Sequence, residues 1–246
     1  MRKLILASAV IAALPLVSAA EESSPFSANV SITSDYAYRG ISQTDEKPAL
    51  QGGFDFKHGS GLYVGVWGSS ISWLRDAETF ESSGNSVELD LYAGYSKSFG
   101  DAGVDVGVLH YGYPGKFGSR WRDDTRLKND TGLKNPNTTE GYVGVSWKFV
   151  SFKYSHAFTH LFGTPDSKGS DYFDLSLSHD VIENLTLAAH VGKQRVFGPG
   201  ESYIDWKLGA TYKLAGFDFG LHYVNTDIDH VDEADDRVIF SIGRSF

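Results

Sequence analysis

The chain has 246 residues, of which 31 are Asp or Glu and 22 are Lys or Arg, and it contains no cysteine. The acidic balance argues against nucleic acid as a partner, because phosphate binding depends on clustered Lys and Arg. Without cysteine no disulfide framework is possible, so hydrogen bonds and apolar burial must hold the fold.

Residues 1–20 have the pattern of a secretory signal peptide. Arg2-Lys3 gives a charged start, Leu4 to Val17 is apolar but too short to span a bilayer, and Val17 to Ala20 offers small residues for cleavage. A mitochondrial presequence would be rich in Arg and amphipathic. We therefore predict an exported domain over residues 21–246, whose net charge falls from −9 to −11 when Arg2-Lys3 is removed.

The first part of the mature chain alternates apolar and polar residues and contains no helical span. No apolar run of about 18 residues follows the signal. Phe26 to Arg39 has the period of two that is typical of a half-buried strand. Gly40 to Lys47 is predicted as a polar loop, and Ala49 to Lys57 is predicted to turn at His58–Gly61 into a strand over Leu62 to Trp73.

The segment from Ser86 to Tyr113 shows the strand pattern most clearly. Apolar residues such as Leu89 alternate with Glu88 and Asp90, and after Gly100–Ala102 the alternation resumes, as expected of an antiparallel hairpin. The charged face of this hairpin must be solvated and cannot pack against a second sheet. The pattern predicts further strands at Glu140–Phe149, Phe152–Phe158, Asp171–His179, Leu185–Val196, Tyr203–Lys213, Phe217–Asn225 and Arg237–Phe246.

The connecting segments alternate in length along the chain. Joins after even-numbered strands are short, whereas joins after odd-numbered strands are mostly longer and polar, which is typical of outer-membrane barrels. A soluble lipocalin gives no reason for this alternation, and a β-sandwich would need Greek-key crossovers and two aliphatic inner faces. We therefore predict an all-β fold: a transmembrane, antiparallel, up-and-down β-barrel of about twelve strands in the outer membrane of a Gram-negative bacterium.

Aromatic residues support the same prediction. The sequence contains 13 Tyr, 16 Phe and 5 Trp, which lie largely at the predicted strand ends, where two interfacial girdles would form. The last strand ends in Phe246, on the same face as Phe240 and Val238. A terminal Phe on an amphipathic strand is similar to the signal that the barrel-assembly machinery recognises, so that machinery is an expected partner, together with outer-membrane lipid and lipopolysaccharide.

Near the mature N-terminus, Val30 to Thr44 reads Val-Ser-Ile-Thr-Ser-Asp-Tyr-Ala-Tyr-Arg-Gly-Ile-Ser-Gln-Thr. This segment, with the continuation Pro48-Ala49-Leu50-Gln51-Gly52, closely resembles the proteobacterial family with the profile name Gcw_chp, also labelled TorF-family porins. The resemblance runs through essentially the whole mature chain. It implies an exported β-barrel that conducts small solutes, and it brings no catalytic or ligand residues with it.

Motifs of catalysis are missing from the sequence, and no cofactor is expected. It has no G-x-S-x-G elbow, no H-E-x-x-H and no phosphate-binding loop. His156 and His160 would lie about 13 Å apart on one strand face, too far to share a metal ion. An outer-membrane phospholipase with a lipid-facing Ser-His pair is the alternative enzyme class. His110 and His156 have the outward parity for it, but the sequence places no serine beside them.

The charged residues with inward parity are the candidate site. Residues predicted to line a channel are Asp35, Arg39, Asp55, Glu88, Asp90, Glu140, Lys148, Lys153, Asp205, Lys207 and Arg237, and Lys57, Asp105, Asp174 and Asp218 share their parity. Such charges are costly in a membrane unless they are hydrated or paired. They therefore form either a narrow wet lumen or a plug of ion pairs. Twelve strands are intermediate between filled and open barrels, and abundant inward Gly favours the channel.

Two loops stand out by charge. Pro114 to Thr138 is rich in Lys and Arg, and Thr226 to Asp236 is acidic. We interpret both as solvated outer loops, the first meeting lipopolysaccharide phosphates, while an anion filter folded over the pore mouth is the alternative. The predicted function is passive diffusion of small hydrophilic solutes through a narrow charged lumen. The alternative is a non-conducting structural or adhesive barrel.

Overall fold

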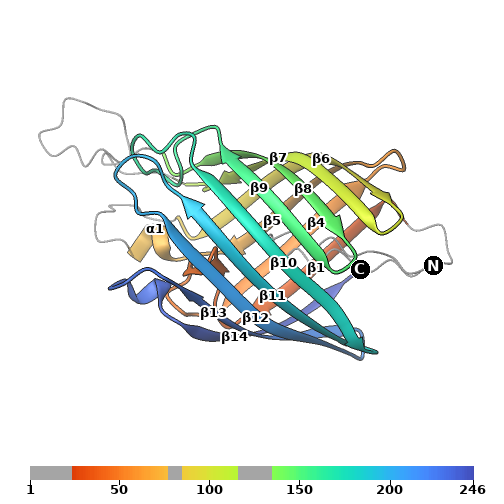
Figure 1. The fold of residues 1–246 in the computed structure, drawn as a ribbon. Helices are drawn as coiled ribbons and strands as arrows, with labels where there is room; N and C mark the ends of the chain where they lie inside the picture. Colours follow the sequence, from red (N-terminus) through yellow and green to blue (C-terminus); the bar gives the residue numbers. More distant parts are fainter. Residues whose placement is uncertain (1–23, 77–84, 116–134) are drawn as a thin grey trace, which may run out of the picture.

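The structure, a computed structural model, describes residues 24–76, 85–115 and 135–246. Twelve antiparallel strands close into one barrel, as β1 (Phe26–Thr33) pairs with both β4 (Ala49–Lys57) and β14 (Arg237–Ser245) (Figure 1). Between them, in chain order, lie β5 (Leu62–Ser70), β6 (Val87–Phe99), β7 (Ala102–Gly112), β8 (Thr138–Trp147), β9 (Val150–Ala157), β10 (Asp171–Ile182), β11 (Leu185–Arg195), β12 (Tyr203–Leu214) and β13 (Phe217–Thr226). The predicted up-and-down barrel of about twelve strands is confirmed. The predicted signal peptide lies outside the described residues.

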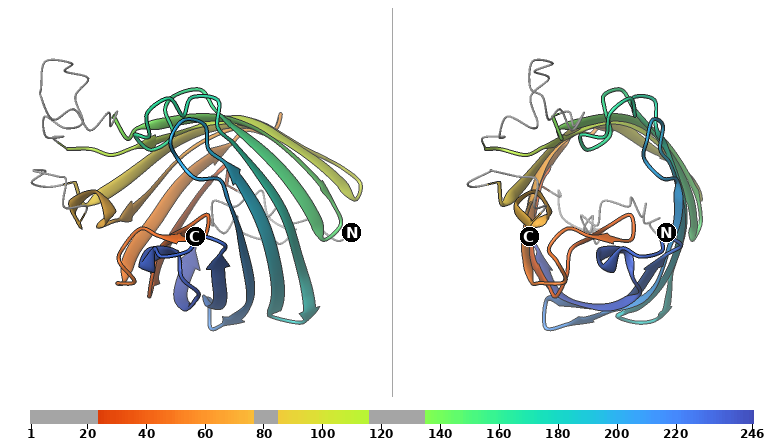
Figure 2. Two further views of the ribbon diagram at one scale, coloured as in Figure 1. Left: turned by 60° about the vertical axis from the view of Figure 1, so that its left-hand side comes forward. Right: turned by 90° about the vertical axis from the view of Figure 1, so that its left-hand side faces the viewer.

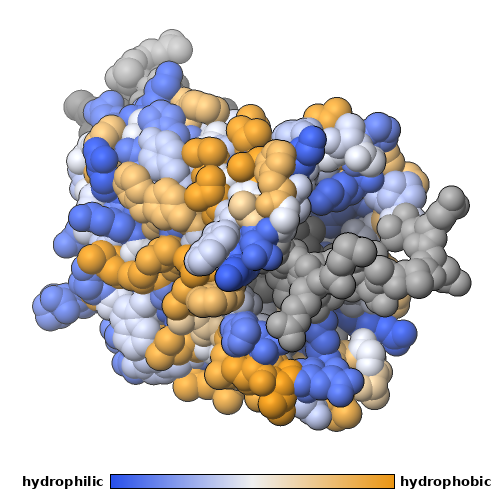
Figure 3. Space-filling model, turned by 45° about the vertical axis from the view of Figure 1, so that its right-hand side comes forward, coloured by the Kyte–Doolittle hydropathy of each residue, from blue (hydrophilic) through white to orange (hydrophobic). Residues whose placement is uncertain are grey.

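The alternation seen in the sequence places apolar side chains on the outside of the barrel. Leu50, Leu91 and Val106 are 60%, 54% and 51% exposed, whereas Glu88 and Asp90 on the other face of β6 are each 2% exposed. Hydrophobic side chains accordingly spread over the outer surface (Figure 3). A water-soluble fold would bury these residues, so the burial pattern is that of a barrel surrounded by lipid.

The connecting segments sort by length onto the two ends of the barrel. The turns at residues 58–61, 100–101, 148–149, 183–184 and 215–216 are short, and several use positive φ angles, as at Gly100, Asn184 and Ala215. The longer joins lie at the other end. The predicted alternation of connectors is thus confirmed.

The prediction of one strand from Phe26 to Arg39 was wrong, because β1 ends at Thr33. The chain then turns into the barrel and forms a small two-stranded sheet from β2 (Ala37–Tyr38) and β3 (Ile41–Ser42), before β4 begins at Ala49. We call residues 34–48 the lumen hairpin. Seen along the barrel, it lies inside the ring of strands (right view of Figure 2).

Other strand bounds also differ from the prediction, for example that of β9, which spans Val150–Ala157 instead of Phe152–Phe158. The predicted strand Leu62 to Trp73 ends at Ser70 and is followed by the short helix α1 (Trp73–Asp76). Strand β8 ends at Trp147 rather than Phe149. Apart from α1, the described part of the chain has one 3-10 turn, η2 (Asp232–Ala234), and neither is long or apolar enough to cross a bilayer.

Candidate functional site

The lumen hairpin is held in its bent shape by its own polar side chains. The hydroxyls of Ser42 and Thr44 donate to Oδ1 of Asp35 at 2.5 and 2.9 Å, and the Tyr36 amide donates to Thr44 Oγ1 at 3.1 Å. At the tip, Arg39 and Gly40 have φ angles of 46° and 83°, which tighten the turn between β2 and β3. These contacts compete with strand pairing and end β1 at Thr33.

Aromatic residues anchor one side of the hairpin on the barrel wall. Tyr36 packs edge-on against Trp67 of β5, with ring centroids 5.4 Å apart, and Tyr38 packs edge-on against Tyr111 of β7 at 5.5 Å. They join a buried cluster that includes Leu109. The barrel therefore contains a small apolar core on its inner face, and this core fixes the hairpin to β5–β8.

The tip of the hairpin reaches the opposite wall through Arg39. Its Nη2 lies 2.7 Å from Oε2 of Glu140 on β8, and its Nη1 donates to Oε1 of Gln194 on β11 at 2.5 Å. The guanidinium also lies 4.1 Å from the ring centroid of Tyr172 on β10. Arg39 thus bridges walls that are three strands apart, so the hairpin crosses the lumen.

A second arginine clamps the hairpin at both its base and its tip. Arg237, the first residue of β14, donates from Nε to Oδ2 of Asp35 at 2.5 Å and from Nη2 to the carbonyl of Gly40 at 2.9 Å. Its Nη1 donates to the carbonyl of Asp235, which follows η2 in the acidic loop. Arg237 and Asp35 are therefore direct partners, whereas Arg39 pairs with Glu140 and Gln194 instead.

Tyrosine hydroxyls bind the lumen carboxylates one by one. Tyr36 donates to Oε1 of Glu88 at 2.9 Å. Burial is the main cause that raises the pKa of the Tyr36 phenol well above its ordinary value, and the negative charge of Glu88 adds to this effect. Tyr63 donates to Asp105 at 2.7 Å, and Tyr92 donates to Asp55 at 2.5 Å. Each donation stabilises a carboxylate that is withdrawn from bulk water.

The basic side chains along β9 to β12 are arranged differently. His190 lies between two carboxylates, with Nδ1 3.2 Å from Oδ1 of Asp174 and Nε2 2.9 Å from Oδ1 of Asp205. Lys153 places its Nζ 4.0 Å from the ring centroid of Tyr142. Neither Lys153 nor Lys207 forms an ion pair within 4.0 Å with a residue that the structure describes. Both lysines are half-buried, so their charges are held inside the barrel without a direct ion-pair partner among the described residues.

The structure brings most of the predicted lining residues together inside the barrel. Asp35 and Arg39 come from the hairpin, and the inward faces of the strands supply Asp55, Glu88, Asp90, Glu140, Lys153, Asp205, Lys207 and Arg237. Lys148 was wrongly placed, because it lies in the turn after β8 with φ of 54° and its Nζ stacks 4.6 Å from the Trp147 ring centroid. That the others line a conducting path stays a prediction.

The inward tyrosines were missed by the sequence analysis, although a signal for them exists. Tyr63, Tyr92 and Tyr142 lie directly opposite Gly94, Gly65 and Gly107 on the neighbouring strands. A Cβ atom at Gly107 would come within 2.5 Å of the Tyr142 hydroxyl oxygen. The space left by these inward glycines is therefore filled by tyrosine rings and does not widen the lumen.

Of the two charged loops, the structure describes the acidic one in full and only the ends of the basic one. Residues 116–134 of the basic loop lie outside the described residues. In the acidic loop, Ala234 is buried, its carbonyl accepts a hydrogen bond from Thr226 Oγ1 at 2.9 Å, and η2 contacts β3 of the hairpin. No group of three or more His, Asp or Glu in the described ranges is placed to hold a metal ion.

Several solved porins have a similar fold. KdgM porin superposes with a TM-score of 0.56 and 8% identity over 89% of this chain and 99% of KdgM. A KdgM porin in complex with disordered oligogalacturonate superposes with a TM-score of 0.53 and 7% identity over 90% of this chain and 97% of that porin. NanC porin superposes with a TM-score of 0.51 and 11% identity over 89% of this chain and 97% of NanC. At such identities the likeness concerns the fold.

Sequence comparison adds one match. The model of a family described as "Bacterial protein of unknown function (Gcw_chp)" matches residues 19–246. No curated protein sequence matches the chain.

Proposed function

The chain belongs to the Gcw_chp family, and from this premise we propose that it is an outer-membrane, porin-like channel for the passive diffusion of small hydrophilic solutes. The observation that carries the proposal is a closed barrel with an apolar outer face and a charged, hydrogen-bonded interior. Charges at such depth are costly unless they are hydrated or paired, so the interior is built to hold water and polar solutes.

The lumen hairpin sets the size limit of the proposed channel. It is fixed to β5–β8 by Tyr36 and Tyr38, while Arg39 and Arg237 tie it to β8, β11 and β14. Solutes therefore pass beside a rigid internal segment, which restricts the path to small molecules.

The charges of the lumen favour neutral or cationic solutes over polyanions. Seven buried carboxylates, from Asp35, Glu88, Asp90, Asp105, Glu140, Asp174 and Asp205, face the charges of Arg39, Arg237, Lys153 and Lys207. Fixed charge of one sign in a confined pore attracts ions of the other sign. We propose a cation preference, which distinguishes this barrel from the KdgM porin solved with oligogalacturonate.

A non-conducting structural barrel is the second candidate, and the hairpin favours it. The hairpin contacts walls on several sides of the barrel, and tyrosine rings fill the glycine positions. If the remaining path is closed, the protein would act through its outer surface.

Conductance in planar bilayers separates the two candidates. In the key variant, residues 35–47 are replaced by a short Gly-Ser link, which the direct pairing of Thr33 with Ala49 allows. The control shortens the exposed join at residues 197–201. For a channel restricted by the hairpin, the wild type conducts and the key variant conducts severalfold more, while the control matches the wild type. A silent wild type beside a conducting key variant supports the structural barrel.

A further inference from the structure

The outer face of the barrel carries a row of polar residues at the end where the longer joins lie. In the register of the strands, His156 of β9, Asp171 of β10 and Arg195 of β11 are direct neighbours. Nδ1 of His156 lies 2.8 Å from Oδ1 of Asp171, and Nη1 of Arg195 lies 3.6 Å from Oδ2 of the same carboxylate. Below them, Tyr154 donates to Asp171 at 2.5 Å.

Aromatic rings surround this row. His156 packs edge-on against Phe158, with ring centroids 5.7 Å apart. The Tyr154 ring is tilted against Phe173 at 5.2 Å, and the Arg195 guanidinium lies 5.6 Å from the Phe197 ring centroid. Charges and amphipathic rings together on the outside of a barrel are typical of the headgroup level of a bilayer. The hydrocarbon level begins immediately below.

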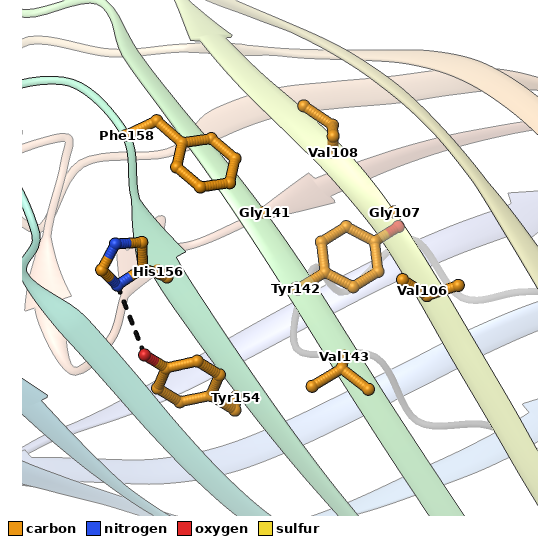
Figure 4. Close-up of a pocket in the computed structure, with 9 residues that line it drawn as sticks. All are labelled: Val106, Gly107, Val108, Gly141, Tyr142, Val143, Tyr154, His156 and Phe158. Atoms are coloured by element: carbon orange, nitrogen blue, oxygen red, sulfur yellow. Dashed lines mark hydrogen bonds between the residues drawn. The ribbon is translucent and has the colours of Figure 1, made fainter.

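A groove runs beside the row over β7, β8 and β9 (Figure 4). Its volume is about 510 Å³. Gly141, which lies between Val108 and His156 in the strand register, forms the floor, and the ring of Phe158 covers it so closely that a Cβ there would lie 2.6 Å from Phe158 Cζ. Val143 and Val108 are 49% and 46% exposed and give the groove apolar walls.

Two cations next to the row are available to an anion. The contact of Arg195 with Asp171 is long, at 3.6 Å, and the Arg195 side chain is 46% exposed. Lys193, two residues earlier on the same outward face of β11, is exposed and forms no ion pair with a described residue. Neighbouring strands are about 4.8 Å apart, so this pair of cations lies roughly 10 Å from the β9 edge of the groove.

We propose that this face is a binding site for a phosphorylated glycolipid of the outer leaflet, of the lipid A type. An acyl chain lies in the groove against Val108 and Val143, beside the Phe158 ring, and a headgroup phosphate binds Lys193 and Arg195, while His156 and Tyr154 contact the sugar hydroxyls. The wide, multiply acylated headgroup of such a lipid spans β10, the one strand between the groove and the cations, whereas the smaller headgroup of a two-chain phospholipid does not. The site lies on the outer face and does not depend on conduction.

The phospholipase alternative gains no support from the same region. The polar partners of His156 are Tyr154 and Asp171, and His110 contacts Thr139 at 2.9 Å. Within the described residues, no serine is hydrogen-bonded to either ring.

Native mass spectrometry of the folded barrel in detergent, with added lipid A, tests the proposal. The variant Lys193→Gln/Arg195→Gln should retain roughly tenfold less lipid A, as expected for the loss of charge-assisted contacts. The control Lys97→Gln/Arg244→Gln removes the same two charges from the outward face at the opposite rim, where both also stack on phenylalanines. It should bind like the wild type. Heat-modifiable migration in gels verifies that each variant is folded.

The groove is tested separately with Val143→Trp, which fills it and leaves the cations in place. This variant should also retain roughly tenfold less lipid A. Equal binding of phosphatidylglycerol and lipid A by the wild type would overturn the proposal, as would equal losses in the two charge variants. Full competition by inorganic phosphate would show a headgroup contact alone and would equally overturn it.

Discussion

Nε of Arg237 lies 2.5 Å from Oδ2 of Asp35, and both side chains are buried, at 7% and 4% exposure. This ion pair joins β14 to the segment that follows β1, directly beside the seam where β1 and β14 close the barrel. One contact thus serves both the closure of the barrel and the anchoring of the lumen hairpin.

Replacing one partner of this pair should destabilise the barrel and loosen the hairpin. Arg237→Gln leaves the Asp35 carboxylate buried without its cation, which typically costs about 3–5 kcal/mol. The midpoint of heat-modifiable migration should fall, and single-channel currents should become larger and noisier. Asp35→Asn should have a similar effect, whereas the double variant should be milder than the sum of the single ones because the two residues are directly coupled. Additive losses would show that the contact is not energetically coupled.

Neutralising the tip of the hairpin should change ion selectivity as well as stability. Arg39→Gln removes the partner of Glu140, so an uncompensated carboxylate remains where the hairpin crosses the lumen. The reversal potential under a salt gradient should therefore shift toward cations. The shift should be larger at low salt, because the Debye length grows to about 30 Å at 0.01 M. A folded variant with unchanged selectivity at low salt would show that Arg39 is only a structural brace.

Much of the barrel could be predicted because its physics is local and periodic. The alternation around Glu88 and Asp90 fixes which face is polar, and short turns such as Gly100–Asp101 fix the neighbouring strands. An even number of strands then allows β1 and β14 to close the barrel as an antiparallel pair. Even so, Lys148 was predicted as part of a strand although it lies in a turn. Its positive φ angle cannot be recognised from hydrophobic periodicity.

The arrangement within the lumen depends on long-range contacts that a pattern of period two does not contain. Tyr36 and Tyr38 have strand-like spacing, yet they belong to a hairpin because Asp35 bonds Ser42 and Thr44. Which wall Arg39 reaches depends on barrel curvature and on the exact end of β1. The family-specific segment was visible in the sequence, whereas its inward fold was not.

The pairing of tyrosine with glycine predicts a sensitive position on β7. At Gly107, an added Cβ would lie 2.5 Å from the Tyr142 hydroxyl oxygen and 2.6 Å from the carbonyl oxygen of Ala93. Because the second neighbour is backbone, Gly107→Ala should destabilise the barrel by about 1–3 kcal/mol, the usual cost of overpacking. Gly59→Ala is the matched control, since nothing lies within 4 Å of its Cβ. Equal melting midpoints of the two variants would show that the Tyr142 ring is not tightly packed against β7.

The unpaired lysines should separate electrostatic from structural roles in the lumen. Lys153 and Lys207 form no ion pair with a described residue, in contrast to Arg39 and Arg237. Lys153→Gln/Lys207→Gln therefore removes two positive charges without leaving a broken ion pair. The reversal potential should move toward cations, as in Arg39→Gln, because the variant removes positive charge that lies near the carboxylates of the lumen.

Stability provides the second readout of the lysine variant. No directly paired carboxylate loses its partner, so the melting midpoint should stay close to that of the wild type, whereas Arg39→Gln and Arg237→Gln should both lower it. Lys213→Gln serves as the control, because this lysine already lies 3.8 Å from Asp218 near the short-turn end and its charge is compensated there. A lysine variant that loses stability while keeping its reversal potential would mean that these two cations support the barrel wall and take no part in selecting solutes.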